Sequence, residues 1–150
     1  MRSKKAIKNN NQKGYQWGLT IDMWECILFP GHMQEGGFLE VLFSDKKLQR
    51  ICSDEKLLQK EYGQNARKIQ RRLFELYSVE NLSQISPFPP PRRHQLKGDR
   101  KGQFAVDVKQ PFRIVFIPAN NPVPIKEDGG VDLEKITIVE IVWIGDYHGE

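Results

Sequence analysis

The proline run PFPPP at residues 87–91 constrains the fold of this chain more than any other feature. Proline lacks a backbone N–H group and has a fixed φ angle, so neither a helix nor a central strand can continue through such a run. The sequence before it shows helical periodicity, and the sequence after it alternates as strands do. We therefore expect helices and a sheet that are separate along the chain, as in an α+β domain.

The segment before the prolines predicts one strand followed by helices. FLEVLF at 38–43 is rich in strand-forming residues. Ser44 or Asp45 is suited to cap a first helix, Ser53 to cap a second, and Gly63 to end it.

The clearest helix is NARKIQRRLFELYSV, residues 65–79. An apolar stripe at helical spacing predicts the face that packs on the sheet. Its members are Ala66, Ile69, Leu73, Leu76 and Tyr77. The basic residues lie largely off the stripe: Arg67, Lys68, Arg71 and Arg72.

Three strands are expected after the prolines. QFAVDVK (103–109) alternates, FRIVFI (112–117) is apolar except for Arg113, and KITIVEIVWI (135–144) is long and β-branched. The loop 118–135 is rich in Pro, Gly and acidic residues. These patterns predict an antiparallel meander with helices on one face.

Length and composition indicate one domain with an N-terminal extension. A chain of 150 residues corresponds to a single domain. The first fourteen residues contain five bases and no acids, so we expect residues 1–37 to be partly disordered or loosely attached, and residues 38–150 to form the domain. A short strand or hairpin around Trp17 and Trp24 remains an alternative.

Several classes of protein are disfavoured. No apolar run is long enough to span a membrane, and the basic start lacks the pattern of a signal peptide. The two cysteines, Cys26 and Cys52, do not form a disulfide framework. A cytoplasmic protein is therefore expected.

Charge is divided unevenly along the chain. Residues 60–113 contain 12 bases and 5 acids, a net charge of +7, whereas residues 114–150 contain 2 bases and 7 acids, a net charge of −5. A basic middle indicates a surface that faces a polyanion. The alternative is two solvated faces of opposite sign.

The densest basic stretch is RRHQLKGDRKGQ, residues 92–103. GDRKG within it is not a phosphate-binding P-loop, because the GK[ST] signature is missing. His32, His94 and His148 do not have the spacing of a zinc site, and no GxSxG motif occurs. Metal-dependent and acyl-transfer chemistry are therefore not expected, and no cofactor is implied.

Arg113 is the most informative single cation, because it lies in an otherwise apolar strand and needs an anionic partner. That partner could be Asp107, Glu140 or a substrate phosphate. The pattern alone does not choose among them.

RNA cleavage needs only the residue types that remain. The substrate's 2′-hydroxyl is the nucleophile, so a base, an acid and cations that stabilise the phosphorane are sufficient. His94 and His148 are suited to proton transfer, and Tyr147 could stack on a base. The alternative is that both histidines are ordinary surface groups.

RRHQLKGDRKGQFAVDV, PFRIVF and the terminal GDYHG together resemble the HigB-type toxins of the RelE/ParE superfamily, over about residues 38–149. The resemblance implies a small twisted antiparallel sheet packed against N-terminal helices. It implies a cytoplasmic mRNA interferase of a type II toxin–antitoxin system, which cleaves mRNA on the ribosome without metal. It also implies a cognate antitoxin, a small helix-turn-helix protein, through which alone the toxin contacts operator DNA.

The resemblance also assigns roles to residues. The catalytic positions are His94, Lys97, Arg113, Tyr147 and His148. The expected RNA contacts are Arg92, Arg93, Arg100, Lys101 and Asp146.

Two segments depart from the family pattern. Residues 1–37 have no counterpart, and the loop 118–135 is longer than usual, so it could lie beside the cleft and gate it or meet the antitoxin. The ParE branch shares the fold but acts on DNA gyrase. A toxin that acts by binding gyrase, or mainly as an antitoxin-bound DNA co-repressor, is therefore the alternative function.

Overall fold

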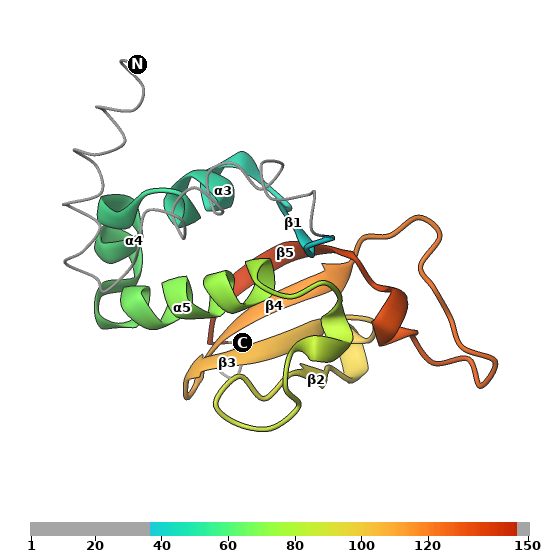
Figure 1. Ribbon diagram of the computed structural model, residues 1–150. Coiled ribbons are helices and arrows are strands. Elements are labelled where there is room, and N and C mark those ends of the chain that lie inside the picture. Colours follow the sequence, from blue (N-terminus) through green and yellow to red (C-terminus); the bar gives the residue numbers. More distant parts are fainter. Residues whose placement is uncertain (1–36, 147–150) are drawn as a thin grey trace, which may run out of the picture.

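The chain forms a mixed α+β structure with a five-stranded sheet, and the computed structural model describes residues 37–146 (Figure 1). The first part comprises β1 (Glu40–Phe43), α3 (Lys46–Cys52), α4 (Glu55–Tyr62) and α5 (Ala66–Tyr77). The second part comprises β2 (His94–Gln95), β3 (Phe104–Lys109), β4 (Phe112–Pro118) and β5 (Ile138–Gly145). Short 3₁₀ turns are η3 (Gly63–Asn65), η4 (Leu82–Gln84), η5 (Gly98–Arg100) and η6 (Leu133–Lys135). Residues 1–36 of the expected extension 1–37 lie outside the described residues.

The helix ends confirm two of the predicted caps and correct one. Asp45 caps α3, since its carboxylate accepts a hydrogen bond from the Leu48 N–H at 2.8 Å. Asp54, not Ser53, caps α4, because its extended backbone aims the carboxylate at the first free N–H groups. Ser53 instead ends α3, where its hydroxyl donates to the Gln49 carbonyl. Gly63 ends α4 with φ +52°, a left-handed conformation that suits glycine.

The predicted apolar stripe of α5 is confirmed. All five of its members are buried in the main core, together with side chains of β3, β4 and β5. The expectation for the basic residues fails at one position, because Arg72 is also buried. Its Nε donates to the backbone carbonyl of Asp107 at 2.7 Å, so this cation joins the helix to β3.

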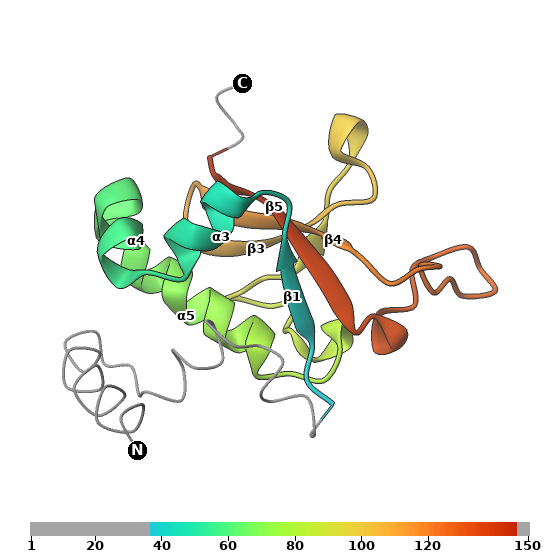
Figure 2. The ribbon, with the colours of Figure 1, turned by 90° about the horizontal axis from the view of Figure 1, so that it is seen from above.

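The sheet has the strand order β1-β5-β4-β3-β2. The pairs β3–β4 and β4–β5 are antiparallel, as the meander predicted. The expectation of a wholly antiparallel sheet is wrong, because β1 pairs with β5 in parallel (Figure 2). Three helices follow β1, so no hairpin forces it to run against its neighbour. The two-residue strand β2 was not predicted, because it is too short to show alternation.

The helices cover one face of the sheet, where the main core lies. The opposite face carries a small apolar cluster of Leu96, Ala105 and Val115, with Trp143 packed against it. Strand register places His94, Ala105, Val115 and Trp143 in one row on this face. Asp107 and Arg113 form the next row. Residues of the predicted site thus meet on the side away from the helices.

The segment between β4 and β5 projects from the sheet as a hairpin-like loop (Figures 1 and 2). Asn120 stabilises the base of this loop, because the Asn120 side-chain oxygen accepts hydrogen bonds from the backbone N–H groups of Thr137 and Ile138. The loop leaves β4 at Pro118, at the opposite end of the strand from Arg113. It therefore does not flank Arg113, contrary to the expectation that it lies beside the cleft.

Among the helices within residues 37–146, none is long and apolar enough to cross a bilayer.

The burial of Leu73 predicts a large effect on stability. Leu73→Ala should lower the free energy of unfolding by about 2–5 kcal/mol, because it leaves a cavity between α5 and the sheet. The measurement is urea unfolding followed by circular dichroism. Lys68→Ala, at an exposed position of the same helix, should change it by less than about 0.5 kcal/mol. Equal effects would contradict the assigned face of α5.

Candidate functional site

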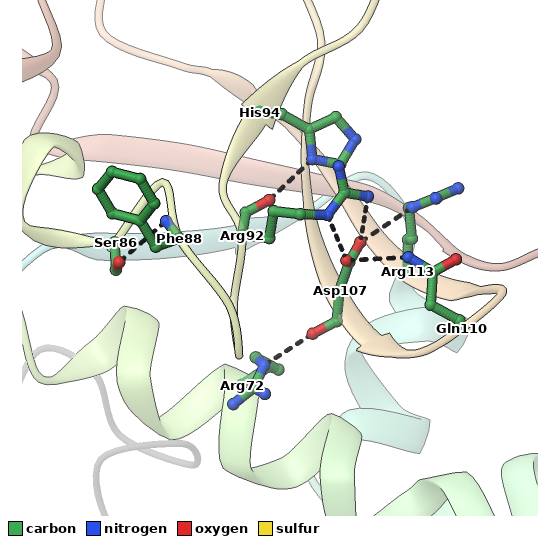
Figure 3. Close-up of polar contacts among 8 residues, drawn as sticks. All are labelled: Arg72, Ser86, Phe88, Arg92, His94, Asp107, Gln110 and Arg113. Atoms are coloured by element: carbon green, nitrogen blue, oxygen red, sulfur yellow. Dashed lines mark hydrogen bonds and ion pairs between the residues drawn. The ribbon is translucent and has the colours of Figure 1, made fainter.

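The centre of the site is the carboxylate of Asp107, which two guanidinium groups hold (Figure 3). Arg92 binds it through both oxygens, with Nε at 2.6 Å from Oδ2 and Nη2 at 3.1 Å from Oδ1. Arg113 Nε donates to Oδ1 at 3.0 Å, and the Gln110 amide donates to Oδ2 at 3.3 Å. Two cations and one anion leave this cluster with a net positive charge.

Arg113 forms an ion pair across the sheet with a residue of the neighbouring strand. Arg113 pairs with Asp107, which lies directly opposite on β3, whereas Glu140 lies opposite Ile117. The Arg113 side chain is only 6% exposed, so an ion pair is needed to offset its loss of water.

The backbone of Asp107 is held as firmly as its side chain. Its carbonyl accepts from Arg72 Nε at 2.7 Å, and its N–H donates to the Pro91 carbonyl at 2.7 Å. Arg72 is itself paired with Glu75 at 2.7 Å. Asp107 therefore connects α5, the end of the proline run and β4 at a single residue.

His94 joins the cluster through the backbone of Arg92. Its Nδ1 lies 2.8 Å from the Arg92 carbonyl oxygen. A carbonyl can only accept a hydrogen bond, so Nδ1 is the donor, and in the neutral form of the imidazole the lone pair then lies on Nε2. His94 is half-buried, and an imidazole in this tautomer can accept a proton at Nε2.

Arg92 has an unusual backbone conformation. Its φ is +44°, and it is the one residue other than glycine with a positive φ among residues 37–146. A side chain with a Cβ atom rarely adopts this left-handed region. Residues in such conformations persist where their surroundings hold them, and they are common at functional sites.

The other predicted basic residues lie apart from this cluster. The Nε of Arg93 donates to the Ile85 carbonyl at 2.9 Å. Burial lowers the pKa of the Arg93 guanidinium. The guanidinium of Arg100 lies over the Trp143 ring, 5.2 Å from its centroid. Lys97 and Lys101 are exposed around η5. The structure thus brings Arg92, His94 and Arg113 together and forms a second basic region around η5.

Trp143 was not predicted as part of the site. Its indole covers Gly145, where a Cβ atom would lie 2.8 Å from the ring. A side chain at 145 would therefore push Trp143 away from Arg100. The spacing W-x-G at the end of a strand was the available signal.

The terminal triplet is only partly described. Asp146 follows β5 and is half-buried. Tyr147 and His148 lie outside the described residues, so their predicted roles stay predictions. Within residues 37–146, no three His, Cys, Asp or Glu side chains are arranged to hold a metal ion.

The chain matches no protein-family model, and neither a curated protein nor a solved structure shows significant similarity to it. The residues of the site and their contacts are therefore the basis for proposing a function.

The pairing of Asp107 predicts how stability depends on pH. Burial raises the pKa of this carboxyl, but the hydrogen bonds and charges of Arg92 and Arg113 outweigh it and lower the pKa below its ordinary value. The folded state then favours the ionised form. This stabilisation is complete above the unfolded pKa of about 3.9 and is lost as the pH falls through the lower folded value.

Asp107→Asn should therefore cost up to about 3–5 kcal/mol at pH 7, since it leaves buried cations without their anion. The difference in unfolding free energy between parent and variant should narrow below about pH 4. Urea unfolding from pH 3 to 7 measures this, with Lys109→Gln, at an exposed position of the same strand, as the control. A difference that does not vary with pH would contradict the assignment.

Proposed function

We propose that this protein is a metal-independent endoribonuclease, the toxin of a type II toxin–antitoxin system with a RelE/ParE-like fold, and that it cleaves mRNA on the ribosome. The observation that carries the proposal is the orientation of His94, whose Nδ1 donates to the Arg92 carbonyl and whose Nε2 is left as the basic nitrogen. Next to it lies the cluster of Arg92, Arg113 and Asp107 with its net positive charge.

These groups suit the cleavage of RNA by its own 2′-hydroxyl. His94 Nε2 takes the proton of the 2′-hydroxyl, whose oxygen bonds to phosphorus. The bond from phosphorus to the 5′-oxygen breaks, and an acid protonates that oxygen. The products are a 2′,3′-cyclic phosphate and a 5′-hydroxyl. The family pattern gives His148 as an acid or base, and in this scheme it is the acid.

The cations have separate tasks in this scheme. The guanidinium groups of Arg92 and Arg113 stabilise the charge that develops on the phosphorane. Because Asp107 already holds both side chains, little reorganisation is needed when the phosphate arrives. Lys97 and Lys101, exposed around η5, contact the flanking phosphates, and Arg100, held on Trp143, belongs to the same region.

The arrangement of the sheet supports the RelE/ParE-like assignment. Helices cover one face, and the other face presents the basic and imidazole side chains. An antitoxin that binds this toxin would block the face without helices or hold its residues apart. Operator DNA would be contacted through the antitoxin.

The role of His94 is tested by its removal. His94→Ala should lower the rate of the chemical step by ~10²–10⁴-fold, the usual contribution of a positioned base. Gln95→Ala, at the exposed neighbouring position of β2, should cleave as the parent does. The measurement is single-turnover cleavage of mRNA in ribosome complexes, and of free RNA with EDTA present.

Two results would contradict the proposal. If the His94→Ala variant cleaves RNA at the parent rate, another group carries the proton. A folded parent that cleaves nothing, yet still arrests growth, would favour inhibition of gyrase or another binding function.

The basic region around η5 predicts that binding depends on salt. Each phosphate contact contributes about 0.7 to the slope of log K against log salt for a single strand. Changing both Lys97 and Lys101 to Gln should lower that slope by about 1–1.5. Changing Lys126 and Lys135 in the projecting loop should leave it unchanged. Fluorescence anisotropy with a labelled single-stranded RNA provides the measurement. If the Lys126 and Lys135 changes lower the slope and the Lys97 and Lys101 changes do not, the RNA binds the loop instead.

A further inference from the structure

We propose that Asp107 is a positioning residue for His94 and acts through Arg92. The carboxylate holds the Arg92 side chain, this stabilises the left-handed backbone of Arg92, and the carbonyl of Arg92 then fixes the tautomer of His94. The consequence for catalysis rests on the proposed function, whereas the effect on the tautomer does not.

The first link is between Asp107 and Arg92. The Arg92 guanidinium contacts both carboxylate oxygens, at 2.6 and 3.1 Å, which fixes its orientation as well as its position. Asp107 also donates its N–H to the carbonyl of Pro91, the residue before Arg92. It therefore holds the chain at residues 91 and 92 through one backbone and one side-chain contact.

The second link is the conformation of Arg92 itself. A φ of +44° is unfavourable for arginine, so the surroundings must hold it. The Arg92 N–H donates to the Phe88 carbonyl at 3.1 Å, and the Arg93 N–H donates to the Ser86 carbonyl at 2.9 Å. These two bonds close the turn after the prolines, and the ion pair with Asp107 adds a side-chain anchor from β3.

The third link runs from Arg92 to His94. The backbone angles of Arg92 set the direction of its carbonyl, which accepts from His94 Nδ1 at 2.8 Å. A histidine hydrogen bond to a carbonyl selects which ring nitrogen carries the proton. His94 Nε2 is then the basic atom because of two successive contacts, the ion pair of Asp107 with Arg92 and the hydrogen bond of the Arg92 carbonyl with His94.

Contacts that do not involve Arg92 also hold Asp107 in place. Arg113 holds one carboxylate oxygen, and Arg72 holds the backbone carbonyl. Loss of the Arg92 side chain therefore leaves Asp107 paired. The side chain of Arg92 is also 35% exposed, so variants at this position are compatible with the fold.

The test separates the side chain of Arg92 from its backbone. In Arg92→Ala the ion pair is lost and the left-handed conformation is still disfavoured. In Arg92→Gly the ion pair is lost as well, but glycine adopts a positive φ without penalty. Two-bond ¹H–¹⁵N correlation spectra of the histidine rings, recorded about two pH units above the ordinary histidine pKa of about 6.5, report the tautomer. A spectrum of His94→Ala identifies the His94 signals.

We expect the Nδ1–H tautomer to dominate in the parent and in the Lys109→Gln control. Arg92→Ala and Asp107→Asn should lose this dominance, and Arg92→Gly should retain more of the Nδ1–H form than Arg92→Ala. The proposal is overturned if Arg92→Ala keeps the parent tautomer. It is also overturned if Arg92→Gly loses the Nδ1–H form as fully as Arg92→Ala, because the backbone would then not be the link.

A cleavage assay adds the catalytic consequence. Arg92→Ala and Arg92→Gly lack the same cation, so a faster chemical step in Arg92→Gly supports positioning of His94, and equal rates refute its catalytic importance. If the parent cleaves no RNA, the proposed function fails, but the tautomer measurement still decides whether Asp107 orients His94.

Discussion

The pairing of Asp107 with Arg92 and Arg113 is the interaction on which the arrangement of the candidate site depends. A carboxylate removed from water is stable only when cations and hydrogen-bond donors replace its hydration. Here the donors come from the end of the proline run and from β4, while Arg72 on α5 holds the backbone of the same residue. One anion thereby sets the distance between three separate segments.

The sheet determines which side chains can reach this anion. Successive residues of a strand point to opposite faces, so a shift of one residue would exchange the two sets of side chains. The pairing of Asp107 with Arg113, and of His94 with Ala105, puts these polar residues on the face without helices. Irregularities in register between Asp107 and Lys109, and between Val115 and Phe116, preserve the main core on the other face.

The face of the sheet that carries no helices combines two basic regions of different character. At one end, Asp107 holds the partly exposed Arg92 and the buried Arg113, which the proposed function assigns to the reacting phosphate. Around η5, the lysines are exposed, and Arg100 lies on Trp143. Exposed lysines retain their water and their freedom to follow a flexible strand. Under the proposed function, this division would hold an RNA strand loosely along its length and tightly at one phosphate.

Local sequence determined the elements of this protein, because periodicity, capping and proline effects act within a few residues. The apolar stripe of α5, the strands after the prolines, the cap at Asp45 and the stop at Gly63 were all predictable in this way. Only the tertiary structure decided that β1 lies parallel to β5, that Asp107 rather than Glu140 faces Arg113, and that Arg72 is buried. The same holds for the contact of Arg100 with Trp143 and for the tautomer of His94. Each of these depends on which distant segments meet, and that is set by burying one common core and by neutralising the charges trapped beside it. No pattern within a single segment contains that information.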